Sequence, residues 1–412
     1  MDDKQPIRKE DYIFGLDIGA SKVNLFVGIS GGDSVRVIEC GDFPLANPDE
    51  FDSVVEKLQQ AVHMLESSAA VDVHDVYVGI AGKHVLSFNY KGLITLPTGE
   101  VREEDIINVQ RQASTLPTSA GEIIHVFPGE YTLDDEEHIR NPKGRSGRRL
   151  GVDVQLVTSR QNAMQNLAKC VNRAGLNVLG FVLEPLAAAC AVLTDDEREL
   201  GVALVDIGAG SADIAVFVND SVRYTASLDL AGNVITSDIS KCLPVPISLS
   251  KAEEIKKKYG TCLISNLIED ETFPVPAVGD RGDVPCSKKL LAHVITARVQ
   301  EIFKLLSDDL KKHQMDSIIN GGIVLTGGCC ALEGIENVAT KVFGKSVRIG
   351  RPKGMTGIQE AFQNPSYATG IGLLHYANKQ HRERKTKDTG TQIAVSMKKG
   401  FQRFRDFVRT YF

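Results

Sequence analysis

The sequence predicts an α/β fold of two related lobes, followed by a C-terminal amphipathic helix. Two apolar runs end in Asp17 and Asp206 and lead into short glycine-containing turns, 189 residues apart (206 less 17). A third apolar run ends in two glycines at 327–328, and residues 397–412 place aromatic and basic side chains on opposite faces of a helix. The repeat predicts the lobes, and the last segment predicts the helix.

The composition is that of a globular protein, 42% hydrophobic and 24% charged over 412 residues, which predicts two to three domain-sized units. Residues 1–11 are polar and contain no apolar signal region. No stretch reaches the about 18 apolar residues of a spanning helix, so we expect any membrane contact to be peripheral. The eight cysteines include no Cys-x-x-Cys pair, and we interpret them as reduced thiols of a cytosolic protein.

Charge is distributed unevenly along the chain, whose net charge is −6. Residues 379–412 contain ten Lys and Arg against three Asp and Glu, a net charge of +7, which leaves −13 on the remainder. A basic tail on an acidic body predicts a negatively charged partner for the tail. Anionic lipid and nucleic acid both have that charge.

The repeated unit is strand, turn, strand, turn and strand in each half of the chain. Residues 13–21 and 202–211 contain the first strand and its turn, and 23–29 and 214–218 form the second strand. Each second run then meets a turn signal and a third strand-like run. A repeat this long indicates two related lobes rather than a solenoid.

We expect ligand chemistry at these turns. Small residues let the backbone approach a ligand closely, and successive backbone N–H groups form a concave anion site. Asp17 and Asp206 stand at the strand ends, where a carboxylate can reach a hydrated Mg²⁺ that bridges phosphates. Two facing turns would clamp a polyphosphate between the lobes; the alternative is two β-hairpins that use glycine only for turning. The small residues of the two turns are Gly19, Ala20, Ser21, Gly208, Ala209, Gly210 and Ser211.

A third glycine turn follows the apolar run 323–326. Gly327 and Gly328, with Cys329 next to them, would let the flat adenosine of a nucleotide lie against the backbone. Residues 331–340 look helical by their apolar spacing. Alone this turn is a weak signal, but its place after two phosphate turns indicates an ATP site.

The order of these motifs resembles the actin, hexokinase and heat-shock ATPase superfamily, and within it the bacterial cell-division family FtsA. The two phosphate turns match at 15–22 and 205–213, and the adenosine turn matches at 325–328. The two connecting helices match at 184–189 and 364–374. Residues 81–161 resemble the 1C subdomain that FtsA has in place of the 1B subdomain of actin. The tail after 395 is the second segment that favours FtsA within the superfamily.

Some positions depart from the family pattern. The residues that stand where the family usually has Gly, Thr or Ser are Ala209, Ala212, Cys329 and Cys330. Residues 231–233 stand where a double glycine is common. Alanine at 212 removes a hydroxyl that could contact phosphate or metal. The resemblance therefore implies ATP and Mg²⁺ as cofactors, with at most weak ATPase activity.

The resemblance implies an actin-like fold of duplicated ribonuclease-H-like domains. The first lobe would comprise 12–80 and 162–200, with the 1C-like subdomain inserted at 81–161. The core of the second lobe would comprise 201–228 and 306–377, the latter with the return helix. Its outer 2B subdomain would be 229–305. A flexible linker at 378–395 and the membrane-targeting helix at 396–412 would follow.

The resemblance also implies roles for residues outside the turns. Glu184 would orient the attacking water by accepting its proton; the alternative is an acidic residue favoured by the dipole at a helix N-terminus. Lys22 would reach a phosphate as a flexible point charge, or be a solvated lysine. Gly232 and Asn233 would flank the phosphates.

The charged segment 251–257 is predicted to be a helix. By the same resemblance, Glu253, Lys256 and Lys257 would contact ribose and adenine. The alternative is a solvated helix face held by pairs of opposite charge three and four residues apart.

Residues 397–412 form a two-faced helical wheel after a polar, charged segment that reads as a linker. At about 100° per residue, the apolar side chains fall within about 140°. The residues expected to enter or contact the membrane are Phe401, Phe404, Phe407, Val408, Tyr411, Phe412, Lys398, Lys399, Arg403, Arg405 and Arg409. Aromatic anchors opposite a basic face are typical of an interfacial helix. A terminal helix that docks on its own body or in a partner groove is the alternative. Nucleic acid fits less well, because the aromatics are not interleaved with the basic residues.

The resemblance implies a protein that polymerises head to tail with ATP and tethers the FtsZ ring to the cytoplasmic face of the cell membrane at the division site. The C-terminal peptide of FtsZ would bind 229–305, anionic lipid would bind the tail, and later division proteins would be recruited. The alternatives are a small-molecule kinase, an ATP-driven chaperone or a pilus-assembly homologue. A kinase needs a substrate-facing catalytic Asp in the first lobe, and 81–161 has no evident catalytic pair. Only 38 residues follow Leu374 for a chaperone's substrate domain.

Overall fold

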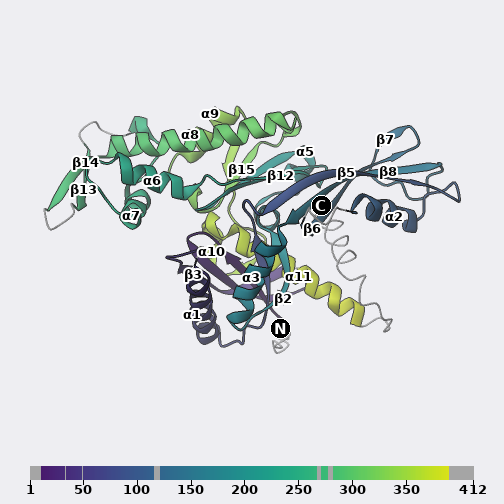
Figure 1. Cartoon of the computed structure of the whole chain (residues 1–412), viewed down its shortest axis with the longest axis horizontal. Coiled ribbons are helices and arrows are strands. Elements are labelled where there is room, and N and C mark those ends of the chain that lie inside the picture. Colours follow the sequence, from purple (N-terminus) through teal and green to yellow (C-terminus); the bar gives the residue numbers. More distant parts are fainter. Residues whose placement is uncertain are drawn as a thin grey trace, which may run out of the picture.

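The computed structural model describes residues 11–32, 34–48, 50–115, 121–266, 271–276 and 282–388. Two mixed sheets with helices on their faces form the body, and two smaller units extend from it (Figure 1). The expected membrane helix at 396–412, with all the side chains assigned to it, lies outside the described residues. Among the helices that are described, none combines the length and the apolar composition that crossing a bilayer requires.

A six-stranded sheet forms the core of the first lobe. Its strands lie in the order β17-β3-β2-β1-β4-β9, and their bounds are β17 (Thr356–Gly357), β3 (Ser34–Pro44), β2 (Lys22–Gly31), β1 (Tyr12–Ile18), β4 (Asp75–Ile80) and β9 (Asn177–Leu183). The first three strands of the chain pair antiparallel, whereas β4 and β9 continue the sheet in parallel.

The second lobe repeats this topology. The order is β12-β11-β10-β15-β16, with bounds β12 (Ser221–Leu228), β11 (Ala212–Val218), β10 (Val202–Ile207), β15 (Ile323–Thr326) and β16 (Val347–Ile349). Again three consecutive strands pair antiparallel and two more extend the sheet in parallel. The two-lobed α/β fold predicted from the repeated turns is therefore confirmed.

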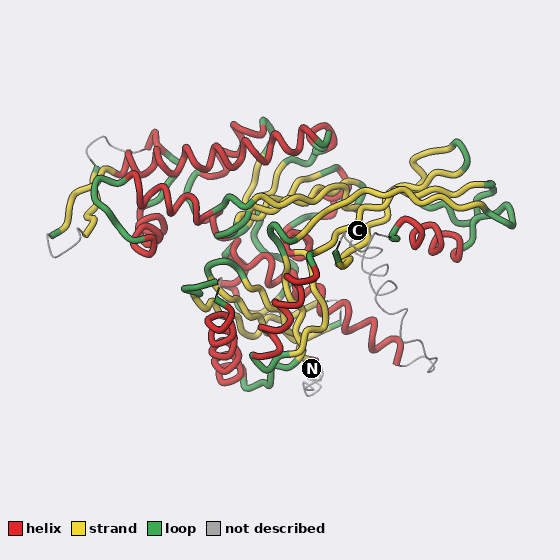
Figure 2. Tube along the Cα trace, in the orientation of Figure 1, coloured by secondary structure: helices red, strands yellow, loops and turns green. Residues whose placement is uncertain are grey.

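Helices cover both faces of each sheet, as the tube in Figure 2 shows. The helices on the outer face of the first sheet are α1 (Phe51–Ala69) and α3 (Gln161–Arg173). Those on the outer face of the second are α6 (Gly232–Cys242), α8 (Lys288–Lys312) and α9 (Ile335–Phe343). Between the two sheets lie α4 (Glu184–Val192) and α11 (Ala368–Asp388), which share one apolar cluster with strands of both lobes.

The two central helices pack unusually closely because their contact residues are small. In α4, the side chains from Leu186 to Ala189 are fully buried. Gly372 of α11 lies against the backbone of Ala187, and a Cβ at that glycine would collide with the Ala187 carbonyl oxygen. The glycine therefore sets the distance between the helices that join the lobes.

The inserted subdomain is a separate sheet between β4 and α3. Its elements are β5 (Val85–Thr95), α2 (Glu103–Ala113), β6 (Glu122–Leu133), β7 (Glu136–Ile139) and β8 (Arg149–Ser159), and the strands lie in the order β5-β8-β6-β7. It has its own apolar cluster, to which α2 contributes Val109 and Ala113. Figure 1 shows it at one end of the long axis.

The outer subdomain of the second lobe lies at the opposite end (Figure 1). It contains α6, α7 (Leu249–Tyr259) and a hairpin of β13 (Thr272–Pro276) and β14 (Asp283–Ser287). The helix predicted at 251–257 is α7. The boundary expected at 305 is wrong, because α8 runs unbroken through it and packs under the second sheet.

Short elements complete the described chain. They are α5 (Asp195–Leu200), α10 (Gln359–Gln363), and the 3₁₀ turns η3 (Ile264–Asn266), η4 (Asp316–Ile318), η5 (Gly328–Ala331) and η6 (Pro365–Tyr367). The helix expected at 331–340 is split. Gly334, at φ 79°, separates η5 from α9.

The linker expected at 378–395 is wrong in its first part, because α11 continues to Asp388. Asn378, Lys379 and Gln380 are polar but buried. The Asn378 side-chain amide donates to the carbonyl oxygen of Gly32 at 3.0 Å. Because these residues are polar, apolar spacing does not predict this part of the helix. Its contacts with the first lobe stabilise it instead.

Candidate functional site

The two turns predicted to bind phosphate have the same geometry. In the first turn, residues 18–22, the Gly19 N–H donates to the Lys22 carbonyl at 3.0 Å. In the second turn, residues 207–211, the Gly208 N–H donates to the Ser211 carbonyl at 2.9 Å. Each turn therefore closes over the same interval and presents its small residues at the end of a β-hairpin.

The turns come from different lobes and meet. A Cβ placed on Gly210 would lie 2.8 Å from the Cβ of Ala20, closer than side-chain atoms approach. Gly210 is therefore needed for the two backbones to lie this close. The two turns therefore lie against each other across the boundary between the lobes.

Carboxylates stand directly behind the turns. Asp17 accepts a hydrogen bond from the Asn24 side chain at 3.2 Å, and these two residues are cross-strand partners. Asp206 accepts one from Thr369 of α11 at 3.0 Å. Its own cross-strand partner is Asp213, which accepts from Ser211 at 2.6 Å. The Ser211 hydroxyl is thus directed to Asp213.

Glu184 is the first residue of α4 and lies close to these aspartates. Its side chain lies over Gly79 of β4, where a Cβ would be 3.1 Å from the Glu184 Cγ. The same carboxyl lines a groove of about 1550 Å³ between the first lobe and the inserted subdomain. Burial, and then the charges of Asp17, Asp213 and Asp206, raise the pKa of Glu184 well above its usual value.

The aspartates share this electrostatic environment. Burial and the neighbouring Asp213 raise the pKa of Asp206 to about 7. Burial also raises the pKa of Asp17 and of Asp213, and the hydrogen bonds from Asn24 and Ser211 offset only part of that rise. The neighbouring aspartates thus destabilise the charged forms of Glu184 and Asp206, which makes the site favourable for a cation. Across the described ranges, no three His, Cys, Asp or Glu side chains are arranged to hold a metal ion directly.

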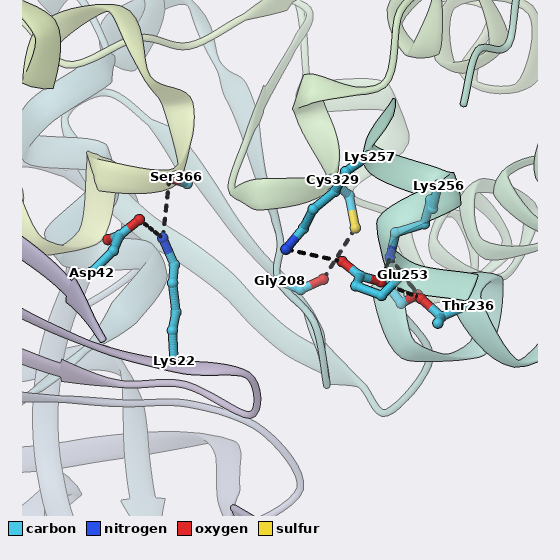
Figure 3. Close-up of polar contacts among 10 residues, drawn as sticks. Lys22, Asp42, Gly208, Thr236, Glu253, Lys256, Lys257, Cys329 and Ser366 are labelled. Carbon is cyan, nitrogen blue, oxygen red and sulfur yellow. Dashed lines mark hydrogen bonds and ion pairs between the residues drawn. The ribbon is translucent and has the colours of Figure 1, made fainter. Parts of the chain in front are cut away.

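The third turn, residues 327–330, completes the group. Gly327 has φ 90° and packs against Asp206 and Ile207, where any side chain would collide. Gly328 faces open space, with no atom within 4 Å of a Cβ placed on it. The Cys329 thiol donates to the Gly208 carbonyl at 3.2 Å and so joins the third turn to the second (Figure 3).

Gly232 and Asn233 begin α6 beside the second turn. Their N–H groups donate to the carbonyls of Gly208 and Ala209, at 3.1 and 2.7 Å. A Cβ on Gly232 would lie 2.9 Å from the Cys329 sulfur. These two residues therefore support the second turn through the backbone.

The α7 residues Glu253, Lys256 and Lys257 form an ion-pair network (Figure 3). The Lys256 ammonium is buried and lies 2.6 Å from Glu253, 2.8 Å from the Thr236 hydroxyl and 3.0 Å from the Gly232 carbonyl. Lys257 lies 3.5 Å from the other oxygen of Glu253. Lys256 thus ties α7 to the start of α6, while Lys257 is exposed.

Lys22 lies at the base of the first turn and points to the start of α11 (Figure 3). Its ammonium lies 2.9 Å from Asp42 and donates to the Ser366 hydroxyl at 3.3 Å. The tyrosine ring at 367 lies 5.2 Å from the same ammonium. The Lys22 ammonium is thus held between Asp42 of β3 and Ser366 of η6.

Sequence reasoning missed Asp213 and Thr369 as members of this site. Asp213 follows Asp206 by the same interval that separates Asn24 from Asp17, so the repeat contained a signal. Thr369 carried none, because its contact depends on how α11 packs between the lobes.

Family models match most of the chain. The model described as cell division protein FtsA matches residues 203–372, and the one described as the SHS2 domain inserted in FtsA matches 82–158. A type IV pilus assembly protein PilM model matches 130–263. The SHS2 match falls on the inserted subdomain.

Solved structures show the fold. The PilM-PilN type IV pilus biogenesis complex contains a chain with a TM-score of 0.62 and 18% identity, covering 90% of this chain and 98% of that one. MreB5 of Spiroplasma citri bound to ADP has a TM-score of 0.56 and 13% identity, covering 92% and 99%. The fold is therefore actin-like.

Curated relatives extend over nearly the whole chain. The cell division protein FtsA of Pseudomonas aeruginosa is 39% identical over 371 residues, covering 88% of each chain. That of Neisseria meningitidis is 38% identical, covering 90% of this chain and 91% of the relative. That of Escherichia coli K12 is 35% identical, covering 97% and 98%. With this identity over this length, the chain belongs to the FtsA family of cell-division proteins.

Proposed function

We propose that this chain binds ATP with Mg²⁺ between its two lobes, assembles head to tail and holds the FtsZ ring on the cytoplasmic face of the membrane. The observation that carries the proposal is the pair of matching turns that meet at Ala20 and Gly210 with a carboxylate behind each. Two hairpins that used glycine only for turning would have no reason to meet.

The turns would receive the phosphates. Backbone N–H groups of Gly19, Ala20 and Ser21 from one lobe, and of Gly208, Ala209 and Gly210 from the other, would surround them. Gly328 leaves open backbone surface for adenosine. The related MreB5 structures, bound to ADP and to AMPPNP, support a nucleotide in this fold.

Mg²⁺ fits the carboxylates through its water shell. Mg²⁺ keeps several waters and binds one or two carboxylates plus substrate phosphates. That suits Asp17 and Asp206, which lie near Glu184 and Asp213. Among the described residues, no group of three side chains is arranged to coordinate a metal ion directly. Once bound, the ion would supply charge for the phosphates, and the raised carboxyl pKa values would return toward normal.

The α7 residues would serve the nucleotide differently from one another. Lys256 has three acceptors around its ammonium, so we propose that it fixes α6 and the second turn. Glu253 and the exposed Lys257 would face ribose and adenine. Lys22 would keep Asp42 and Ser366 as partners and direct its remaining hydrogen to a phosphate.

Hydrolysis would be slow. Glu184 lies near Asp17 and Asp206 and would orient the water, but its raised pKa would reduce the carboxylate fraction until a cation is bound. Ala212 is fully buried and offers no hydroxyl. ATP would therefore serve assembly more than turnover.

The membrane and protein partners complete the proposal. The tail 396–412 would insert its aromatic face into the interface while its basic face meets anionic lipid. The outer subdomain, expected at 229–305 and extended here to the end of α8, would bind the C-terminal peptide of FtsZ. Family membership supports these partners. A pilus role has the partial PilM model match and a likeness of fold at 18% identity.

The direct test is nucleotide binding by the purified chain, measured by calorimetry with MgATP. The wild-type protein should bind at one site, and Asp17→Asn should weaken binding by roughly tenfold or more, since it removes one carboxylate from the metal site. Asp308→Asn, on the exposed side of α8, is the matched control and should bind normally. Equal binding by the two variants would contradict the assignment.

A further inference from the structure

His125 connects the inserted subdomain to the helix that carries Glu184. It lies on β6 and is 1% exposed. Its Nε2 accepts a hydrogen bond from the backbone N–H of Leu183 at 2.9 Å. Leu183 ends β9, at the edge of the first sheet, and immediately precedes Glu184.

The N–H group at this place needs an acceptor from elsewhere. Helix N-termini leave backbone N–H groups without intrahelical partners, and a buried N–H without an acceptor is costly. Leu183 is the N-cap residue of α4, and the N3 residue whose side chain would accept from its N–H in a capping box is the apolar Leu186. The imidazole therefore takes the place of a capping side chain, but it comes from another subdomain.

The imidazole is suited to accept. A ring nitrogen accepts a hydrogen bond only when it is unprotonated, which places the proton of a neutral ring on Nδ1. Burial lowers the pKa of His125 to about 3, so the ring is neutral at physiological pH. The hydrogen bond therefore does not depend on pH in the physiological range, and it couples the position of β6 to that of α4.

A second contact from the same subdomain reaches one of the carboxylates near Glu184. The N–H of Gly82, at the point where the chain leaves β4, donates to Asp213 at 3.4 Å. A cavity of about 20 Å³, room for about one water, is lined by one residue of each contact, Leu183 and Asp213. Its walls come from the inserted subdomain, the start of α4 and the second lobe, and include Val85, Leu183 and Asp213.

We propose that His125 is a positioning residue for Glu184. By holding the Leu183 N–H, it fixes the first turn of α4 and hence the direction of the Glu184 carboxyl. A displacement of the inserted subdomain would then alter the water-orienting group without contact with the nucleotide. This inference rests on the proposed function, in which Glu184 orients the attacking water.

The test compares variants that differ in where they place an acceptor. In His125→Gln, the side-chain amide oxygen can reach the position of Nε2, whereas in the shorter His125→Asn it cannot. His125→Leu removes the acceptor altogether. Each full-length variant is assayed for MgATP turnover at saturating nucleotide, for nucleotide affinity, and for hydrogen exchange of the peptide that contains Leu183.

The Asn and Leu variants should turn over MgATP about tenfold more slowly, in the range seen when a supporting hydrogen bond is lost. Their nucleotide affinity should be unchanged, the Leu183 amide should exchange faster, and the Gln variant should resemble wild type. If Gln and Asn variants turn over equally, or Leu183 exchanges equally in both, the positioning role is wrong. Because both are polar and similar in size, this comparison holds even if the Leu variant does not fold.

Glu184→Gln separates this inference from the function on which it rests. It should slow turnover, and adding His125→Asn to it should slow turnover no further, because both act through one carboxyl. If wild type shows no turnover, or Glu184→Gln leaves turnover unchanged, the role of Glu184 fails. If Glu184→Gln slows turnover and the two effects multiply, Glu184 stands and the inference about His125 fails.

Discussion

At the scale of single residues, the aspartates behind the turns are the most informative. The sequence could predict that Asp17 and Asp206 belong to the candidate site, because each ends an apolar run before a glycine turn. It could not predict that Asp213 and His125 lie there. Asp213 pairs with Asp206 across strands, and His125 packs between subdomains. Local patterns identify strand ends; they do not identify partners that only the register or the tertiary fold brings together.

The raised pKa of Asp206 predicts that the proposed binding of MgATP depends on pH. Its value of about 7 in the free protein means that a bound Mg²⁺ must displace a proton below that pH. The affinity for MgATP should therefore fall as pH is lowered from 8 to 6, by up to about tenfold per unit below 7.

Asp206→Asn is the matched variant for this titration. It should bind MgATP weakly, and its remaining pH dependence should be that of the nucleotide alone. Asp308→Asn should keep the wild-type slope. Calorimetry at several pH values measures both, and a wild-type slope identical to that of Asp206→Asn would show that Asp206 does not titrate on binding.

At the scale of elements, the two central helices were partly visible in the sequence. The family resemblance implied connecting helices at 184–189 and 364–374, and α4 and the start of α11 lie there. The end of α11 was not visible. Its last described turns begin with the buried polar residues Asn378 and Gln380, so that tertiary contacts rather than apolar spacing stabilise them.

The close approach of these helices predicts a large cost for one methyl group. Gly372→Ala places a Cβ onto the Ala187 carbonyl, so the helices must separate or the backbone must shift. We expect a loss of about 3 kcal/mol in the free energy of unfolding, and a thermal midpoint lower by roughly 5 °C or more.

Gly180→Ala in β9 is the control for this substitution. Its Cβ would meet the ring of Tyr77 at 3.4 Å, an ordinary contact, and the thermal midpoint should change little. Equal midpoints for the two variants, measured by circular dichroism, would show that α4 and α11 do not pack as described.

At the scale of the whole molecule, three parts surround or extend from the site. The lobes meet at the turns, the inserted subdomain contacts Leu183 through His125 and Asp213 through Gly82, and the outer subdomain extends to the opposite end (Figure 1). Sequence patterning predicted the duplication, because both halves use the same strand and turn order. The relation between the parts required the fold, since it depends on side chains that approach across long sequence separations.

The claim that ATP assembly and membrane attachment belong to one molecule is tested by liposome flotation. Full-length chain and a 1–395 truncation are mixed with vesicles that contain anionic lipid, in the presence of MgATP or MgADP. We expect only the full-length chain to float with the vesicles. MgATP should increase both the fraction of chain bound to the vesicles and the number of filaments seen on them. Equal flotation of both chains would contradict the membrane role of the tail, and equal flotation and assembly with both nucleotides would contradict the coupling to the ATP site.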